Sequence, residues 1–263
     1  MRLGFGTVAV CALICTAVGC GGGGDGGGSS WLVTKSGNII QIAYGSGTQY
    51  PQYGALHTNS GYFRLNCGPD CGWGTSIVVL PSFWENGTYY QGAPISSWSH
   101  TVQGSDLVIL IAGKVSGITA QGTIRLSPPT PSGIVAKVSM TTSGDAQLDN
   151  RPGEAFKPVM LSSMHISSTH WDAKSAYVGD QSFPIPSSGW IINPPVQGSV
   201  FGLVGGSSQW KKNAPTVEIQ METNFQITGW VTYSTDPNDD NVGFWPAADH
   251  VLKSWRYTIT VKP

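Results

Sequence analysis

Three polar side chains near the C-terminus have a spacing that can support bond cleavage or binding. In Thr216–Thr223, Glu218, Gln220 and Glu222 alternate with apolar residues. Because successive side chains of a strand point to opposite faces, an extended segment places both carboxylates and the amide on one face. Two carboxylates that flank a sugar ring can act as nucleophile and acid, and together they break a glycosidic bond.

This segment is similar to the Glu-x-Asp-x-Glu catalytic strand of laminarinase-like glycoside hydrolases, with Gln220 in place of the middle Asp. The resemblance implies a jelly roll in which Glu218 is the nucleophile and Glu222 the acid/base. Residues four apart on a strand have Cα atoms about 13 Å apart, at about 3.3 Å per residue. The side chains must therefore lean together, or a bulge must intervene, to form a retaining pair. The alternative is a solvated strand face balanced by Lys211 and Lys212.

A second polar cluster, Met164–Asp172, holds two of the five histidines, His165 and His170. Histidine is a common general base, and jelly-roll polysaccharide lyases often pair His with Tyr, which would make Tyr177 the partner. The two histidines are five residues apart and fall on opposite faces of an unbroken strand, so joint action requires a turn. The intervening Ser-Ser-Thr favours one. The alternative is structural, with Asp172 accepting backbone N–H groups.

Tryptophan is unusually frequent, with ten Trp against nine Tyr and eight Phe. Flat indole faces stack on the C–H faces of sugar rings, so this abundance favours glycan binding. At least half of the ten are expected to pack in the core, Trp230 and Trp255 among them. The substrate-binding candidates are Trp171, Asp172, Trp190, Trp210, Gln220 and Trp245.

An acidic turn with the sequence DPNDDN offers oxygen ligands for Ca²⁺ from Asp236, Asn238 and Asp240. It is not an EF-hand loop, because Asn241 stands where Gly is required and Ala247 where the bidentate Glu should be. The alternative is a plain Asx-rich turn. Apart from this Ca²⁺, we expect no required cofactor. The sequence contains no serine-esterase, zincin or phosphate-loop motif.

The elements that must position these side chains are short, β-branched segments separated by Gly, Pro, Asn and Ser. With no helical pattern between them, they predict an all-β fold, an antiparallel β-sandwich or jelly roll with at most one short helix, at Pro246–Lys253. Asp106–Ala112 is apolar on both faces, which predicts a central strand covered on both sides. The expected strands are Asn38–Tyr44, Gly61–Asn66, Ser76–Leu80, Asp106–Val115, Gly122–Leu126, Gly133–Thr141, Val159–Ser167, Gly189–Ile192, Val200–Val204, Thr216–Phe225, Ile227–Tyr233 and Trp255–Val261.

The N-terminus predicts export. Arg2 precedes an apolar stretch too short for a stable membrane anchor, which is typical of a signal peptide over residues 1–19. The tetrapeptide that ends in Cys20 resembles the lipobox of bacterial lipoproteins, which implies that Cys20 is lipidated. Residues 20–30 then form a Gly-rich tether, and residues 31–263 a single β-sandwich domain. The alternative is an ordinary secreted protein.

The cysteines agree with export. Cys11 and Cys15 leave with the signal peptide and Cys20 takes lipid, so only Cys67 and Cys71 of the five remain in the domain. In an oxidising compartment, two cysteines this close predict a disulfide. A thioredoxin-type site would need a shorter spacing that opens a helix, and a zinc site would need two further ligands.

Charge excludes some partners. The chain has 14 Lys and Arg residues and 15 Asp and Glu residues, for a net charge of −1. This balance gives no indication of a nucleic-acid partner, and we expect the membrane to be contacted only through the lipid.

The sequence predicts a lipoprotein anchored to the bacterial envelope, at the outer membrane or cell surface. It would bind and cleave an extracellular polysaccharide. The first enzyme class that we expect is a glycosidase, and the second is a polysaccharide lyase. The alternative is a non-enzymatic carbohydrate-binding, structural or adhesion lipoprotein.

Overall fold

The computed structural model describes the chain in segments: residues 28–59, 61–65, 75–78, 83–85, 88–90, 94–115, 118–143, 162–165, 173–184, 189–190, 196–205, 216–222, 227–233, 241–246 and 254–263. Within these segments the chain forms β-strands and turns and contains no helix. None of them could therefore cross a membrane as a helix. The predicted antiparallel all-β fold class is confirmed.

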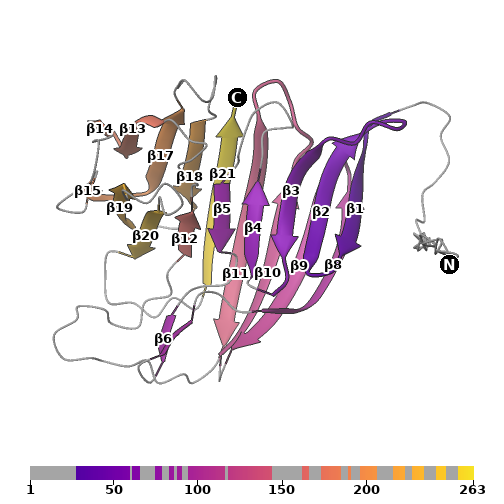
Figure 1. Cartoon of the computed structure of the whole chain (residues 1–263), viewed down its shortest axis with the longest axis horizontal. Helices are drawn as coiled ribbons and strands as arrows, with labels where there is room; N and C mark the ends of the chain where they lie inside the picture. Colours follow the sequence, from indigo (N-terminus) through magenta and orange to yellow (C-terminus); the bar gives the residue numbers. More distant parts are fainter. Residues whose placement is uncertain are drawn as a thin grey trace, which may run out of the picture.

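The first sheet has ten strands, paired antiparallel (Figure 1). In spatial order, with β16 also paired to β19, they are β1 (Ser30–Ser36), β2 (Ile39–Gly45), β3 (Gln52–His57), β4 (Tyr62–Leu65), β5 (Thr75–Val78), β12 (Ser162–His165), β20 (Asn241–Pro246), β19 (Ile227–Tyr233), β15 (Gly189–Trp190) and β16 (Val196–Gly198). Pro246 is thus the last residue of a strand and not the start of a helix. The rest of the predicted helix lies outside the described residues.

The second sheet has nine strands, also antiparallel. In spatial order they are β14 (Gln181–Pro184), β13 (Ala173–Val178), β17 (Val200–Gly205), β18 (Thr216–Met221), β21 (Ser254–Lys262), β11 (Ile134–Ser143), β10 (Ile118–Leu126), β9 (Asp106–Val115) and β8 (Ile95–Gln103). A separate hairpin consists of β6 (Phe83–Glu85) and β7 (Thr88–Tyr90).

Three hairpins turn in two residues, and each turn begins with a glycine of positive φ. The glycines are Gly37, Gly104 and Gly179, with φ of 57°, 64° and 56°. Two-residue turns of this kind need positive φ, which glycine adopts without steric cost. These turns fix the register of β1 with β2, β8 with β9 and β13 with β14.

The two large sheets pack face to face around one hydrophobic cluster (Figure 1). On β11, Ile134, Ala136, Val138 and Met140 are buried, while Lys137 between them is exposed. The same alternation runs along β10, β18 and β21. Each strand therefore gives its apolar side to the core and its polar side to the outer face of the second sheet, the face turned away from the first sheet.

Candidate functional site

The acidic segment lies on the outer face of the second sheet. In β18, Val217 and Ile219 are fully buried, while the Glu218 side chain is 28% exposed and Gln220 is exposed. Glu222, just past the end of the strand, is also exposed. The predicted alternation is therefore confirmed, and both acids and the amide project from one face.

Glu218 is bound by a tyrosine from two strands away. The Tyr177 hydroxyl in β13 donates a hydrogen bond of 2.6 Å to Oε2 of Glu218. Register places Gly202 of β17 directly between them. A Cβ on residue 202 would overlap the ring and hydroxyl of Tyr177, so only glycine lets the ring lie across β17. Lys262 adds an ammonium 3.8 Å from the same carboxylate oxygen.

The tyrosine is the proton donor of this pair. Burial of the Tyr177 hydroxyl, together with its hydrogen bond to Glu218 and the charge of that carboxylate, raises the pKa of Tyr177 well above its usual value of 10. The phenol consequently stays protonated at neutral pH. In this state Tyr177 can donate a proton or a hydrogen bond, but it cannot accept a proton from a substrate carbon.

Glu222 has a different partner on the other side of β18. Thr258 of β21 donates its hydroxyl to Oε1 of Glu222 at 2.5 Å, and the Glu222 N–H donates to the carbonyl of Arg256 at 3.0 Å. Glu218 contacts Tyr177 of β13 and Lys262 of β21, whereas Glu222 contacts Thr258 of β21. The two carboxylates thus have separate partners. Their pairing as nucleophile and acid/base stays a prediction.

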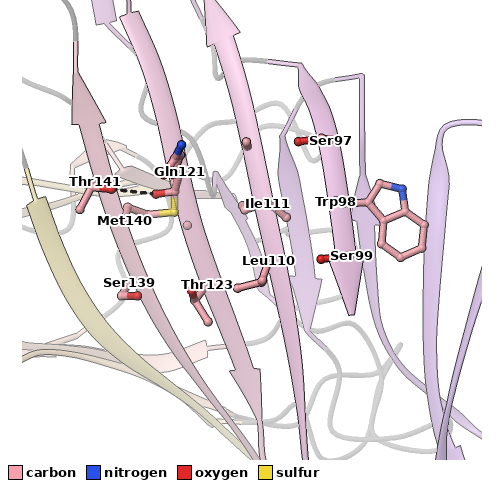
Figure 2. A pocket seen from close by; sticks show the side chains of 12 residues that line it. Ser97, Trp98, Ser99, Leu110, Ile111, Gln121, Thr123, Ser139, Met140 and Thr141 are labelled. Carbon is pink, nitrogen blue, oxygen red and sulfur yellow. Dashed lines mark hydrogen bonds between the residues drawn. The ribbon is translucent and has the colours of Figure 1, made fainter. Parts of the chain in front are cut away.

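The same outer face is hollowed over β8 to β11 (Figure 2). The hollow has a volume of about 630 Å³. The side chains that line it from the outer face are Ser97, Ser99, Leu110, Ala112, Gln121, Thr123, Ser139 and Thr141. Figure 2 shows the indole of Trp98 directed away from them, in keeping with its packing against the core. The described lining thus offers hydroxyls, an amide and an apolar floor, but no aromatic face.

Cross-strand register connects the hollow to the acidic strand. Ser139, in the hollow, lies opposite Thr123 on one side and opposite Arg256 on the other. Arg256 in turn accepts the backbone hydrogen bond of Glu222. The hollow and Glu222 therefore share one face and are separated by a single strand, β21.

His165, the histidine of this cluster that the structure describes, belongs to the other sheet. His165 ends β12, where it pairs with Ser76 of β5 and Asn241 of β20 in the first sheet. Tyr177 lies in the second sheet, where it is bound to Glu218. The structure therefore joins one residue from each proposed mechanism, Tyr177 and Glu218, by a hydrogen bond. The pairing of Glu218 with Glu222, and that of a histidine with Tyr177, stay predictions.

Other predicted site residues are described only in part or not at all. Trp190 and Trp245 lie in β15 and β20 of the first sheet, and nothing is described of their side chains. The remaining candidates lie outside the described residues; they are His170, Trp171, Asp172, Trp210, the calcium ligands Asp236, Asn238 and Asp240, the disulfide cysteines Cys67 and Cys71, and the lipidated Cys20. In the part of the chain that is described, no three His, Cys, Asp or Glu side chains gather into a metal site.

The hollow was missed from the sequence, although a signal for it exists. Ser or Thr occupies alternate positions on two of its four strands, at Ser97 and Ser99 and at Ser139 and Thr141. Such polar alternation marks an outward face but does not show that the face is concave. Concavity comes from the twist of the assembled sheet, which has no local sequence signature.

Comparison with known proteins yields only distant structural likenesses. No protein-family model matches the chain, and no curated protein is significantly similar to it in sequence. An alpha-N-acetylgalactosaminidase from Bifidobacterium bifidum aligns with 88% of this chain at 8% identity and a TM-score of 0.47, and 35% of that enzyme is covered. The chain thus spans about a third of the length of that enzyme.

Two shorter proteins align over nearly their whole lengths. A putative aldose 1-epimerase from Escherichia coli K12 has 12% identity and a TM-score of 0.36, with 89% of this chain and 99% of that one covered. A galactose mutarotase related enzyme from Lactobacillus acidophilus has 7% identity and a TM-score of 0.33, with 89% and 97% covered. At these identities and TM-scores, no conclusion about activity or substrate follows from any of the three.

Proposed function

We propose that the chain is an exported protein that binds a glycan in the hollow on the outer face of the second sheet. The observation that carries the proposal is the lining of this hollow. Neutral hydrogen-bonding side chains converge there from β8, β10 and β11, and all can both donate and accept. A sugar presents many hydroxyls of the same dual character, so a neutral lining of this kind matches it without charge.

The apolar side chains between these hydroxyl groups can contact the apolar face of a sugar ring. Leu110 is 49% exposed and lies beside Ala112 in the same hollow. Contact with the C–H face of a sugar ring would remove this apolar surface from water, which is favourable. The volume of about 630 Å³ lies within the roughly 300–1,000 Å³ that is usual for ligand sites.

We further propose that the chain is held at the bacterial envelope, as its N-terminal sequence predicts. Lipid on Cys20 would anchor the chain to the bacterial envelope, and the Gly-rich residues up to position 30 would form a flexible tether. β1 begins at Ser30, the last residue of this proposed tether. A sheet face on such a tether can reorient toward a polymer outside the cell.

Cleavage of the bound glycan is a second candidate, and the contacts of Glu218 favour it. This carboxylate is partly buried and receives the hydroxyl of Tyr177, with Lys262 close by. A carboxylate and a protonated phenol within hydrogen-bond reach are groups that can act in general acid–base or nucleophilic chemistry. Glu222 lies nearer the hollow, beyond Arg256.

Binding is tested with a screen of polysaccharides followed by calorimetry on the glycan that the screen selects. Thr123→Arg fills the hollow with a long side chain and is expected to weaken binding at least about tenfold, or about 1.4 kcal/mol. Thr34→Arg makes the same change on an exposed position of β1 in the first sheet and is expected to bind like wild type. Equal affinity of the wild type and Thr123→Arg would place the glycan elsewhere.

A further inference from the structure

The two large sheets have four edges without a partner strand in the described part of the chain: β1 and, at the other end, β15 with β16 in the first sheet, and β14 and β8 in the second. Free edges carry unpaired N–H and C=O groups that can pair with another chain, and proteins protect them with charges, prolines or short length. β1 carries Lys35, β14 has four residues and ends in Pro184, and β15 and β16 have two and three residues. Three edges are therefore protected.

β8 lacks every one of these protections. It has nine residues, with the sequence ISSWSHTVQ, and contains no Lys, Arg, Asp, Glu or Pro. All of its residues are exposed except Ile95, which is buried, and Trp98, which is partly buried. Val102 is 53% exposed, a large value for a valine in a strand. A long, uncharged and accessible edge is suited to adding a strand.

The edge of β8 is regular only over part of its length. Its pairing with β9 shifts between Ile95 and Ser97, which leaves Ser97–Gln103 as the segment with an unbroken register. The centre of that segment is His100, whose ring stacks on Trp98 with centroids 5.8 Å apart. A partner strand would therefore pair over Ser97–Gln103.

We propose that this partner is β8 of a second copy, paired antiparallel about a two-fold axis at His100. In this register Trp98 of each copy lies opposite the exposed Val102 of the other, on the face that continues the core. On the outer face, Ser99 lies opposite Thr101 and Ser97 opposite Gln103. The strand is thus complementary to itself, as an isologous interface requires. On one face Trp98 and Val102 meet on either side of the two His100 rings, and on the other face polar side chains meet.

The pairing would also bring two hollows together. Ser97 and Ser99 line the hollow at the β8 edge, which is the edge of the sheet. Joining two copies along this edge makes one continuous sheet whose outer face carries both hollows. Dimerisation itself does not depend on glycan binding, so it can be tested without a glycan.

A charge swap at the two-fold axis tests the proposal with the full chain, using sedimentation velocity over a range of concentrations. Wild type is expected to dimerise. His100→Lys and His100→Glu each place like charges opposite one another at the axis, and each is expected to raise the dimer Kd about fivefold. An equimolar mixture of the two variants pairs Lys with Glu and is expected to restore the wild-type Kd or a lower one. Thr34→Lys, on β1, is the control and should leave the Kd unchanged.

Two results would overturn the proposal. A wild-type chain that stays monomeric at the highest concentration reached excludes pairing through β8. His100→Lys and His100→Glu variants that dimerise as tightly as wild type exclude an axis at His100. A merely structural effect of either substitution is distinguished by the mixture, because two misfolded variants do not restore pairing.

Discussion

Replacing Gly202 by alanine tests the contact between Tyr177 and Glu218. Gly202 does not have a positive φ, so in a strand alanine would ordinarily be the better residue by about 0.5–1 kcal/mol. Here the added Cβ would overlap the Tyr177 ring, whereas ordinary contact begins at 3.4 Å. The ring must therefore move, and the hydrogen bond to Glu218 is lost.

The expected magnitude follows from three contributions. Loss of a hydrogen bond to a charged acceptor costs about 1.5–3 kcal/mol, and overpacking costs about 1–3 kcal/mol. The gain of alanine over glycine offsets about 0.5–1 kcal/mol. Gly202→Ala is therefore expected to lower the free energy of unfolding by about 2–5 kcal/mol.

The assay is urea unfolding of four chains: wild type, Gly202→Ala, Tyr177→Ala and the double variant. In the Tyr177→Ala background the ring is gone, so Gly202→Ala is expected to reverse sign and stabilise the chain by about 0.5–1 kcal/mol. Tyr177→Phe keeps the ring but not the hydroxyl and separates the hydrogen bond from the packing. A Gly202→Ala variant as stable as wild type, or equally destabilised in both backgrounds, would refute the contact.

Three further predictions concern the tyrosine, the acid and the anchor. Because the pKa of Tyr177 is raised on folding, the stability it contributes is full below pH 10 and declines as the pH rises above it; urea midpoints from pH 8 to 11 should fall more steeply for wild type than for Tyr177→Phe, and parallel curves would contradict this. Glu218→Gln is expected to slow release of reducing ends from the bound polysaccharide about 100-fold or more, and an unchanged rate removes Glu218 as a catalytic residue. In cells fed a clickable palmitate analogue, wild type should take up label and Cys20→Ser should not; label on both would exclude Cys20 as the lipidation site.

The alternation of β18 could be predicted because it is local. Apolar residues at every second position give a strand one buried side, and Val217 and Ile219 are indeed fully buried. The expected strand Ile227–Tyr233 has the same bounds as β19 for the same reason. Fold class follows once enough such segments occur without a helical pattern between them.

Strand neighbours could not be predicted, and they decide the site. Tyr177 and Glu218 are 41 positions apart, and they meet because β17 lies between their strands and contributes Gly202 there. No period in the sequence shows which strand lies next to which. The proposed His165–Tyr177 pair illustrates this too. The two residues are near in sequence, but the sequence did not show that their strands belong to different sheets.

The predicted place of one strand within its sheet is also wrong, because that prediction rests on hydrophobicity. The apolar run Asp106–Ala112 predicts a central strand covered on both sides, but β9 is next to the edge strand β8. On its outer face Val108 is buried and Leu110 is 49% exposed. An apolar run shows what a strand can bury and not what covers it. β8 was not expected at all, because its serines give it little strand character outside a sheet.

The most direct test of the central claim is methyl NMR of the chain, labelled at Leu and Thr, during titration with the glycan that binds. Binding in the hollow is expected to shift the methyl signals of Leu110, Thr123 and Thr141. Leu32 and Thr34, on the outer face of the first sheet, supply matched residue types that should not move. Shifts at Leu32 and Thr34 with none at Leu110 and Thr123 would show that the hollow is not the glycan site.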